Sequence, residues 1–277
     1  MSMVHKAKKS MGQNFLKSKE ALFKMCEAGG VEGSDIVVEI GPGKGALTEK
    51  LLERAKKVFA LEMDRDLVTI LEERFKEEIK NKKLEIIEGD CLDFNPDTFF
   101  KNTQYKIIAN IPYNITGSII RKFLSDVKNK PTLMALLVQK EVAERIVARD
   151  GKESILSLSV KAYATPKYIM KVHKRFFSPE PKVDSAIISI NDISNKFFKE
   201  KSGEELFFRL IKTGFAHKRK VLRKNLEDLQ HMEVRLPNIK EVGLPKIDEI
   251  FEKLEINPKA RAEDIKFEKW IQISRLL

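Results

Sequence analysis

Cysteine and histidine are scarce in this chain of 277 residues. The two cysteines, Cys26 and Cys91, lie far apart and lack metal-ligand spacing, which argues against a disulfide framework and against a zinc module. The histidines predict no metal site either. They are scattered along the chain: His5, His173, His217 and His231.

Apolar segments long enough to cross a membrane are also missing. No stretch reaches the roughly 18 uninterrupted apolar residues that a spanning helix needs. The N-terminal segment 1–16 is basic and lacks the apolar core of a signal peptide. We therefore expect a soluble, cytoplasmic protein with no membrane contact.

Positive charge is plentiful. The chain carries 52 Lys and Arg residues against 41 Asp and Glu residues, a formal net charge of +11. Such an excess favours association with phosphate polyanions or with anionic membranes, and charge alone does not choose between them. The length fits one large domain, or a large domain with a smaller one.

Short apolar runs alternate with amphipathic stretches in the first part of the chain. The runs predict strands at 36–40, 58–61, 84–87, 107–109 and 133–138, and the stretches predict helices at 46–54, 65–80, 118–126 and 141–150. This alternation is typical of βαβ units, so we expect an α/β fold with a parallel, doubly wound sheet.

The pattern changes after one more strand-like run at 185–190. A polar stretch, 191–201, follows it, and beyond residue 203 only helical, Lys- and Arg-rich periodicity remains. We therefore predict a sheet domain over residues 1–192 and a small helical domain over residues 193–277.

A glycine-rich loop follows the first of these strands, with Gly41, Gly43 and Gly45 in GxGxG spacing. Glycines allow a sharp turn and let a ligand approach the backbone, although a tight turn without a ligand is the alternative. Glu62 ends the next strand, at the interval where such folds bind a ribose diol. Asp64 is a competitor for that role.

A third acid, Asp90, lies just beyond the following strand, where it could accept a hydrogen bond from an adenine amino group. Each acid taken alone could be a solvated carboxylate or a helix cap. Together with the glycine loop, the acids predict an adenosine-bearing ligand at the carboxyl edge of the sheet.

The fourth strand ends in Asn110-Ile111-Pro112-Tyr113, which predicts chemistry on a planar amine. The Asn110 side-chain oxygen and the Ile111 carbonyl can accept the two hydrogens of an adenine N6, and Pro112 stiffens the backbone. Tyr113 offers a ring face for a base drawn out of its stack. The alternative is a turn that merely ends the strand.

Several stretches together resemble the KsgA/Dim family of rRNA adenine N6,N6-dimethyltransferases, whose relatives include the Erm enzymes. The resemblance covers nearly the whole chain. It rests on residues 12–16 (GQNFL), 39–45, 62–64, 89–90, 110–113, 139–143, 177–185 (FSPEPKVDS) and 261–263.

The resemblance implies a Rossmann-like methyltransferase sheet with an antiparallel final strand, a helical C-terminal domain, and S-adenosylmethionine as cofactor. It places Phe177 as the second wall of the adenine pocket, opposite Tyr113. A core aromatic is the alternative for Phe177, and Phe176 is a second candidate for the wall. The implied cofactor site contains Asn14, Leu16, Gly41, Gly43, Glu62, Asp90 and Asn110.

The resemblance also implies a substrate. The family dimethylates two adjacent adenosines in the 3′-terminal hairpin loop of small-subunit (16S) rRNA, within the immature 30S subunit, and residues 256–263 favour its bacterial branch. The segment 215–224 resembles a basic helix of the family. There Arg219, Lys220, Arg223 and Lys224 would form one cationic ridge, or only a solvated surface. We expect a monomer.

Two further features leave alternatives open. The basic arm 6–9 could contact RNA or be disordered. Leu156-Ser157 stands where the family usually has Gly-Arg, so an RNA-facing or structural contact could differ.

Three other functions compete with the small-subunit enzyme. An Erm-type enzyme would act on 23S rRNA by the same chemistry. A non-catalytic RNA-binding assembly factor would retain only the fold, and intact Asn110 and Tyr113 argue against it. A DNA adenine methylase fits less well, because the C-terminal helices resemble the ribosomal family.

Overall fold

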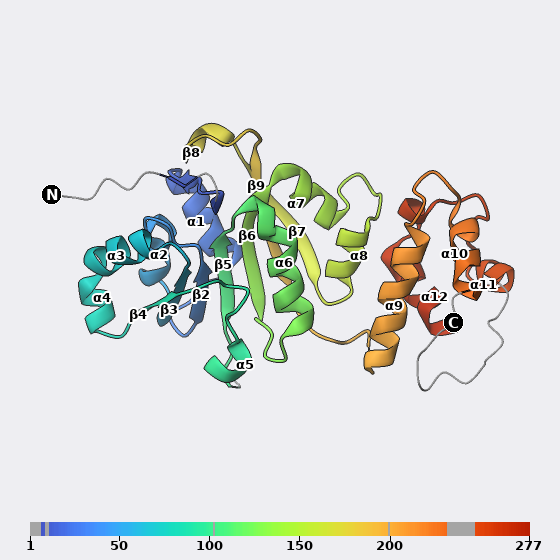
Figure 1. Ribbon diagram of the computed structural model, residues 1–277, viewed down its shortest axis with the longest axis horizontal. Coiled ribbons are helices and arrows are strands. Elements are labelled where there is room, and N and C mark those ends of the chain that lie inside the picture. Colours follow the sequence, from blue (N-terminus) through green and yellow to red (C-terminus); the bar gives the residue numbers. More distant parts are fainter. Residues whose placement is uncertain (1–6, 9–10, 102, 199, 232–246) are drawn as a thin grey trace. The chain divides into compact units, whose positions relative to one another are not determined.

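The computed structural model describes residues 7–8, 11–101, 103–198, 200–231 and 247–277 (Figure 1). The chain forms two compact units. The sheet unit comprises Met1–Ala143 and Ala164–Ser194, and the helical unit comprises Glu144–Tyr163 and Asn195–Leu277. The predicted division into two domains between residues 192 and 193 stays a prediction.

A seven-stranded sheet forms the centre of the sheet unit, in the order β4-β3-β2-β5-β6-β9-β7. The strands from β4 to β6 in this order pair in parallel, whereas β9 pairs antiparallel with both β6 and β7. The predicted α/β fold is confirmed. The strands are β2 (Ile36–Ile40), β3 (Lys57–Glu62), β4 (Leu84–Glu88), β5 (Lys106–Asn110), β6 (Leu133–Gln139), β7 (Thr165–Val172) and β9 (Ser185–Asn191).

Strand β7 was not predicted from the sequence. It is an edge strand whose side chains alternate between exposed and partly buried positions. Alternation of this kind is the normal pattern of a half-buried strand. Lysines occupy two of the three exposed positions, with Ile169 at the third, and Pro166 interrupts the run, so its apolar signal was weak.

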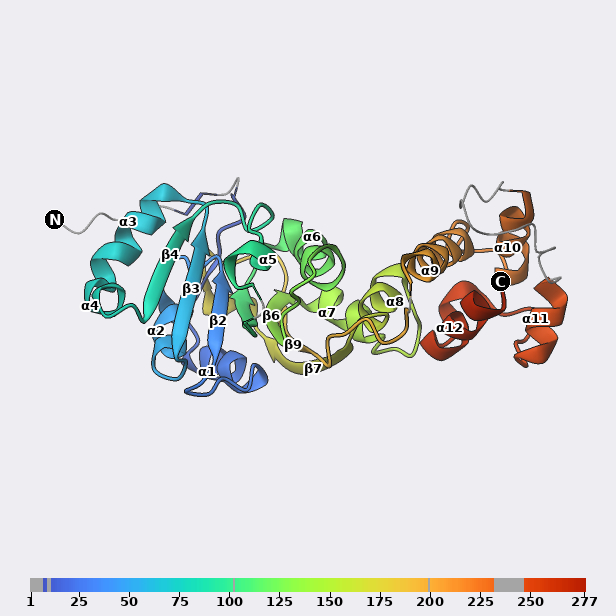
Figure 2. The same ribbon diagram turned by 90° about the horizontal axis from the view of Figure 1, so that it is seen from below.

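Helices cover both faces of the sheet. Helix α1 contacts β5, β6, β9 and α2, so α1 and α2 lie on one face, and α6 lies on the other (Figure 2). The helical segments of this part are α1 (Lys19–Ala28), α2 (Ala46–Leu52), α3 (Arg65–Arg74), α4 (Lys76–Lys80), α5 (Pro96–Phe99), η2 (Tyr113–Ile115), α6 (Thr116–Arg121), η3 (Lys122–Asp126), α7 (Lys140–Val147) and η4 (Lys174–Phe176).

Two short strands, β1 (Phe15–Leu16) and β8 (Phe177–Ser178), pair outside the main sheet. In the main sheet, Ile40 pairs with Leu61 and Asn110 pairs with Leu137, so the carboxyl ends of β2, β3, β5 and β6 lie at one edge. This register brings the predicted site residues of separate strands to the same edge.

The helical unit is built around Trp270, whose side chain is fully buried. Its indole N–H donates to the carbonyl of Ile265 over 3.1 Å, and Phe215 stacks on the ring with centroids 5.7 Å apart. The elements are α8 (Ile155–Lys161), α9 (Lys201–Gly214), α10 (Leu222–His231), α11 (Ile247–Lys253), η5 (Ala262–Asp264) and α12 (Phe267–Leu276).

The expected basic helix over 215–224 is wrong. Helix α9 ends at Gly214 and α10 begins at Leu222, with turns between them, so the four basic residues do not share one helical face. Arg223 is also neutralised locally, because its guanidinium contacts Asp248 (Nη2 to Oδ2, 2.7 Å) and Glu227 (2.8 Å). A single cationic ridge is therefore not present.

Ser157, at the place where the sequence departs from its family, has a structural role. Its side chain is fully buried and donates a hydrogen bond to Glu153 over 2.7 Å. It also accepts from the backbone N–H of Ser154, completing a capping box at the start of α8. A group buried in this way does not face RNA.

Gly45→Ala should destabilise the sheet unit. Gly45 has φ of +82°, and a Cβ there would lie 2.4 Å from Cε2 of Phe75. Backbone strain and overpacking both raise the energy of the folded state. We expect the free energy of unfolding, measured in urea, to fall by roughly 1–3 kcal/mol.

Gly117→Ala is the matched control, because a Cβ at this position of α6 would meet nothing within 4 Å. Alanine is the better helix former by up to about 1 kcal/mol, so this variant should be unchanged or slightly more stable. Equal destabilisation by both changes would contradict the packing argument.

Candidate cofactor and active site

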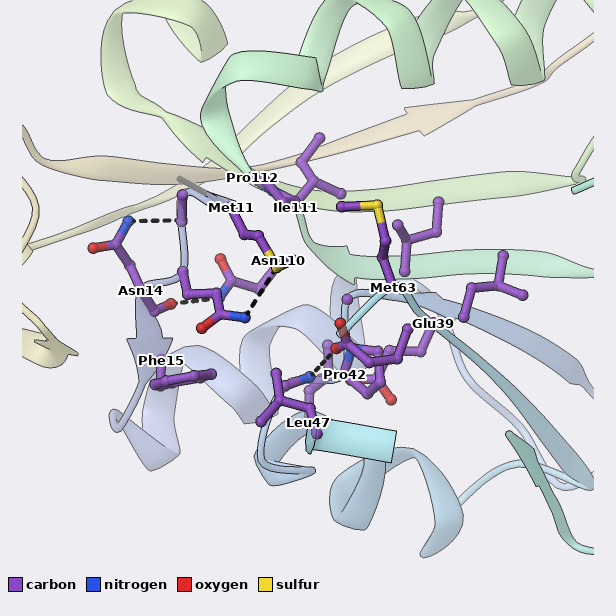
Figure 3. Close-up of a pocket in the computed structure, with 18 of the residues that line it drawn as sticks. Met11, Asn14, Phe15, Glu39, Pro42, Leu47, Met63, Asn110, Ile111 and Pro112 are labelled. Atoms are coloured by element: carbon purple, nitrogen blue, oxygen red, sulfur yellow. Dashed lines mark hydrogen bonds between the residues drawn. The ribbon is translucent and has the colours of Figure 1, made fainter. Parts of the chain in front are cut away.

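A pocket with a cavity volume of about 400 Å³ opens at the carboxyl ends of β2, β3 and β5 (Figure 3). This volume is within the roughly 300–1,000 Å³ range of small-molecule sites. Residues of the N-terminal segment 11–17 form part of its wall. The predicted residues that line it are Asn14, Leu16, Gly41, Gly43, Glu62, Asp90, Asn110, Ile111 and Tyr113.

The glycine loop and Glu62 form one hydrogen-bonded unit. Gly41 and Gly43 have φ of +67° and +59°, and the backbone N–H of Gly43 donates to Glu62 Oε2 over 3.1 Å. The N–H of Asp64 donates to Oε1 over 2.9 Å. Burial raises the pKa of Glu62, and these two N–H groups oppose the rise. Each carboxylate oxygen retains acceptor capacity for a ligand hydroxyl.

Asp64, the competitor of Glu62, is engaged elsewhere. Its carboxylate accepts from Lys8 Nζ over 2.6 Å and from Gln13 Nε2 over 2.7 Å, and it caps α3. Asp64 is buried and does not line the pocket. Its physical role is to tie the N-terminal segment to the loop between β3 and α3. Lys6 and Lys9 of the basic arm lie outside the described residues.

Asn110 ends β5 beside the N-terminal segment. Its amide nitrogen donates to the main-chain carbonyl of Asn14 over 3.2 Å (Figure 3). Because a carbonyl can only accept, this contact requires the amide to present its NH₂ group to Asn14. The amide oxygen of Asn110 is thereby oriented away from that carbonyl and remains an acceptor.

Tyr113 lies in η2, directly after Pro112. Its ring is half-buried at the pocket, and its hydroxyl lies 2.6 Å from the Ser185 hydroxyl at the start of β9. Burial raises the pKa of Tyr113, and the contact with Ser185 opposes the rise. The phenol is therefore a neutral hydrogen-bonding group at neutral pH.

Phe177 is the predicted residue that the structure does not bring to the pocket lining. Its side chain is only 2% exposed and packs in the hydrophobic core with Leu16 and Leu22, while its backbone pairs with Leu16. Phe176 packs against the same core, with the guanidinium of Arg175 5.1 Å from its ring centroid. The stacking role of Phe177 stays a prediction.

Glu39 lines the pocket and was not among the predicted site residues (Figure 3). It is 1% exposed, and its Oε2 has no hydrogen-bond partner among the described residues. Burial raises its pKa to about 8, the Thr48 hydroxyl opposes the rise, and the charge of Glu62 adds to it. An acid within the otherwise apolar strand IVVEI was the signal that could have revealed it.

Comparison with known proteins identifies the family. A model described as ribosomal RNA adenine dimethylase matches residues 4–276. The chain belongs to this family. It is 38% identical to the ribosomal RNA small subunit methyltransferase A of Fusobacterium nucleatum over 99% of this chain and 98% of the relative. Its counterpart from Nostoc sp. is 36% identical, over 98% and 97% of the two chains.

Solved structures agree on the fold. A dimethyladenosine transferase from Plasmodium falciparum is 26% identical, with a TM-score of 0.75 over 94% of this chain and 95% of that one. The 23S rRNA methyltransferase ErmE has a TM-score of 0.74 over 95% and 99% of the two chains, at 22% identity, which shows a shared fold.

The dimethylase is an S-adenosylmethionine-dependent rRNA methyltransferase, as the KsgA/Dim resemblance implied. The pocket fits this cofactor. It contains two buried carboxyl groups, Glu39 and Glu62, and Oε2 of Glu39 has no hydrogen-bond partner in the described part of the chain. A ligand with ribose hydroxyls and a positive sulfonium would supply hydrogen-bond donors for the remaining acceptor capacity of these carboxyl groups, and a positive charge close to them.

Two absences are limited to the described part of the chain. Its helices include none long and apolar enough to cross a membrane. Within the same residues, no group of three or more His, Cys, Asp or Glu side chains could hold a metal ion.

The buried carboxyl of Glu39 should make the stability of the free enzyme depend on pH. The ordinary pKa is 4.5 and the folded pKa is about 8, so the native state holds a proton that the unfolded state has lost between these values. The stabilisation is complete below pH 4.5 and is lost as pH rises through about 8. We expect a decrease on the order of 5 kcal/mol in the free energy of unfolding, or about 1.4 kcal/mol for each pH unit between the two pKa values.

Urea denaturation between pH 5 and about 9, without cofactor, measures this decrease. Glu39→Gln should flatten it, because the glutamine side chain does not titrate. Glu72→Gln, on the exposed side of α3, is the control and should keep the slope of the parent protein. An unchanged slope in Glu39→Gln would show that Glu39 is not the group responsible.

Proposed function

We propose that this dimethylase methylates N6 of two adjacent adenosines in the 3′-terminal hairpin loop of small-subunit (16S) rRNA. It would act in the cytoplasm, as a monomer, on the immature 30S subunit. Support comes from relatives named ribosomal RNA small subunit methyltransferase A, which are matched over nearly their full length. The observation that carries the chemistry is the oriented amide of Asn110 at the pocket.

The target nitrogen is a poor nucleophile because its lone pair is delocalised into the adenine ring. Two acceptors, the amide oxygen of Asn110 and the carbonyl of Ile111, would take its two hydrogens and favour a pyramidal nitrogen whose lone pair points out of the ring plane. Ile111 is buried, and Pro112 has φ of −58°, so the two acceptors sit on a stiff piece of backbone.

Tyr113 would hold the target base by stacking, an interaction worth about 1–3 kcal/mol per base. S-adenosylmethionine supplies a methyl group on a good leaving group. The protein then has to orient the amine and exclude water, and a strong general base is not needed. Glu62 would hold the ribose of the cofactor, and Asp90 its adenine amino group.

The substrate can be tested directly. Immature small subunits and isolated 23S rRNA are incubated with the enzyme and labelled S-adenosylmethionine, and the nucleosides are analysed by mass spectrometry. We expect dimethyladenosine from the small subunit alone. Label in 23S rRNA would support an Erm-type enzyme, whose fold this chain shares. Cofactor binding without transfer to either RNA would support a non-catalytic assembly factor.

Asn110→Ala should separate cofactor binding from methyl transfer. The variant loses an acceptor for the amine but leaves Glu62 and the glycine loop in place. We expect the Kd for the cofactor to change by less than about tenfold and kcat to be nearly abolished. Asn191→Ala, at the opposite end of β9 from Ser185, is the control and should keep normal turnover. Parental turnover in Asn110→Ala would refute the proposed role.

A further inference from the structure

We propose that Ser185 is a positioning residue that holds the ring of Tyr113 along the pocket through the hydrogen bond between their hydroxyl groups. The inference rests on the proposed role of Tyr113 as the stacking surface for the target base. It goes beyond that role by assigning a function to the phenol hydroxyl and to a residue 72 positions away in the sequence.

The local backbone alone does not hold the tyrosine ring firmly. Tyr113 begins η2, a single 3-10 turn of three residues that follows β5 and Pro112. The ring turns about two side-chain torsions, and its second torsion is broad. A hydrogen bond of 2.6 Å at the tip of the ring fixes the position of the phenol oxygen and so restrains the first torsion. Because a phenol O–H prefers to lie in the plane of its ring, the direction of the hydrogen bond also favours one orientation of the ring plane.

Ser185, in contrast, is rigidly held. It is fully buried, and it is the first residue of β9, where it pairs with Gln139 of β6 and with Val172 of β7. The preceding residue, Asp184, accepts a hydrogen bond at its carbonyl from the backbone N–H of Lys140 over 2.9 Å. The Ser185 hydroxyl is therefore a fixed point at the edge of the sheet.

The hydroxyl of Tyr113 is not needed for stacking, since a phenylalanine ring offers the same area. Its contact with Ser185 therefore contributes orientation. A base held by stacking must present its amine to acceptors fixed on neighbouring residues, so a small rotation of the ring would misalign the reacting atoms. The same contact satisfies a hydroxyl that burial removes from water.

Ser185 also connects two sequence motifs. Tyr113 ends the stretch 110–113, and Ser185 ends the stretch 177–185. In the structure these stretches meet through the two hydroxyl groups, although Phe177, the aromatic residue of the second stretch, is buried in the core. The hydroxyl of Ser185 is thus a direct contact between the stretch 177–185 and the pocket residue Tyr113.

A double-mutant cycle on the full-length enzyme tests the proposal, with immature small subunits as substrate. The variants are Ser185→Ala, Tyr113→Phe and the double variant. Each removes the same hydrogen bond, so all three should lower kcat by a similar factor of about ten. The Kd for S-adenosylmethionine should change less than twofold, because neither hydroxyl belongs to the proposed cofactor contacts.

A fluorescence measurement reports the ring position directly. The target adenosine is replaced by 2-aminopurine, whose emission is quenched by stacking on an aromatic ring. Ser185→Ala and Tyr113→Phe should both show weaker quenching than the parent enzyme in the bound state. A purely structural role of Ser185 would lower stability without changing the quenching of the folded protein.

Ser189→Ala is the matched control. Ser189 lies on the same strand, is also buried, and accepts a hydrogen bond from Asn191 Nδ2 over 2.9 Å. The control should keep the parental kcat and quenching. If Ser185→Ala folds poorly, Tyr113→Phe still removes the same hydrogen bond from the half-buried partner.

The outcomes separate this proposal from the function on which it rests. Additive losses in the cycle, or parental kcat in Ser185→Ala, would overturn the positioning role. Tyr113→Ala removes the ring and should lower kcat by about a hundredfold. Full activity in Tyr113→Ala would overturn the stacking function itself, whereas an inactive Tyr113→Ala beside a fully active Ser185→Ala would overturn only the positioning role.

Discussion

The hydrogen bond from the Asn110 amide nitrogen to the Asn14 carbonyl decides which way the side-chain amide of Asn110 faces. An asparagine side chain can present either end to a partner, and only one end can accept a hydrogen from an amine. The N-terminal segment that supplies this carbonyl is itself fixed by the contacts of Asp64 with Lys8 and Gln13. The orientation of the Asn110 amide therefore depends in part on Lys8 and Asp64, which do not line the pocket.

Three acids at the same edge of the sheet have different roles because their neighbours differ. Glu62 accepts hydrogen bonds from two backbone N–H groups and lines the pocket. Asp64 instead forms an ion pair with Lys8 and caps helix α3. Glu39 has a buried oxygen without a partner among the described residues, and burial raises its pKa to about 8. Sequence spacing placed Glu62 and Asp64 within two residues, and only the surrounding contacts distinguish them.

The parallel strands and the positions of the loop residues could be predicted because apolar runs and glycine turns are local signals. The edge strand β7 lacked such a signal. The burial of Phe177 and the break between α9 and α10 depend on packing partners distant in sequence. The spacing of charges along the sequence predicted Arg223 as a free cation. It could not reveal the ion pair with Asp248, which lies 25 residues further along the chain.

The segment Glu144–Tyr163 belongs to the helical unit although it precedes strand β7. Its Glu153 N–H donates to the Glu263 carbonyl over 2.8 Å, and the ammonium of Lys266 donates to the Gly151 carbonyl over 2.7 Å. The polypeptide thus passes between the two units three times. A truncated protein that stopped near residue 192 would keep this segment without its packing partners and expose apolar surface. Excision at that point would yield an aggregation-prone fragment in place of a minimal enzyme.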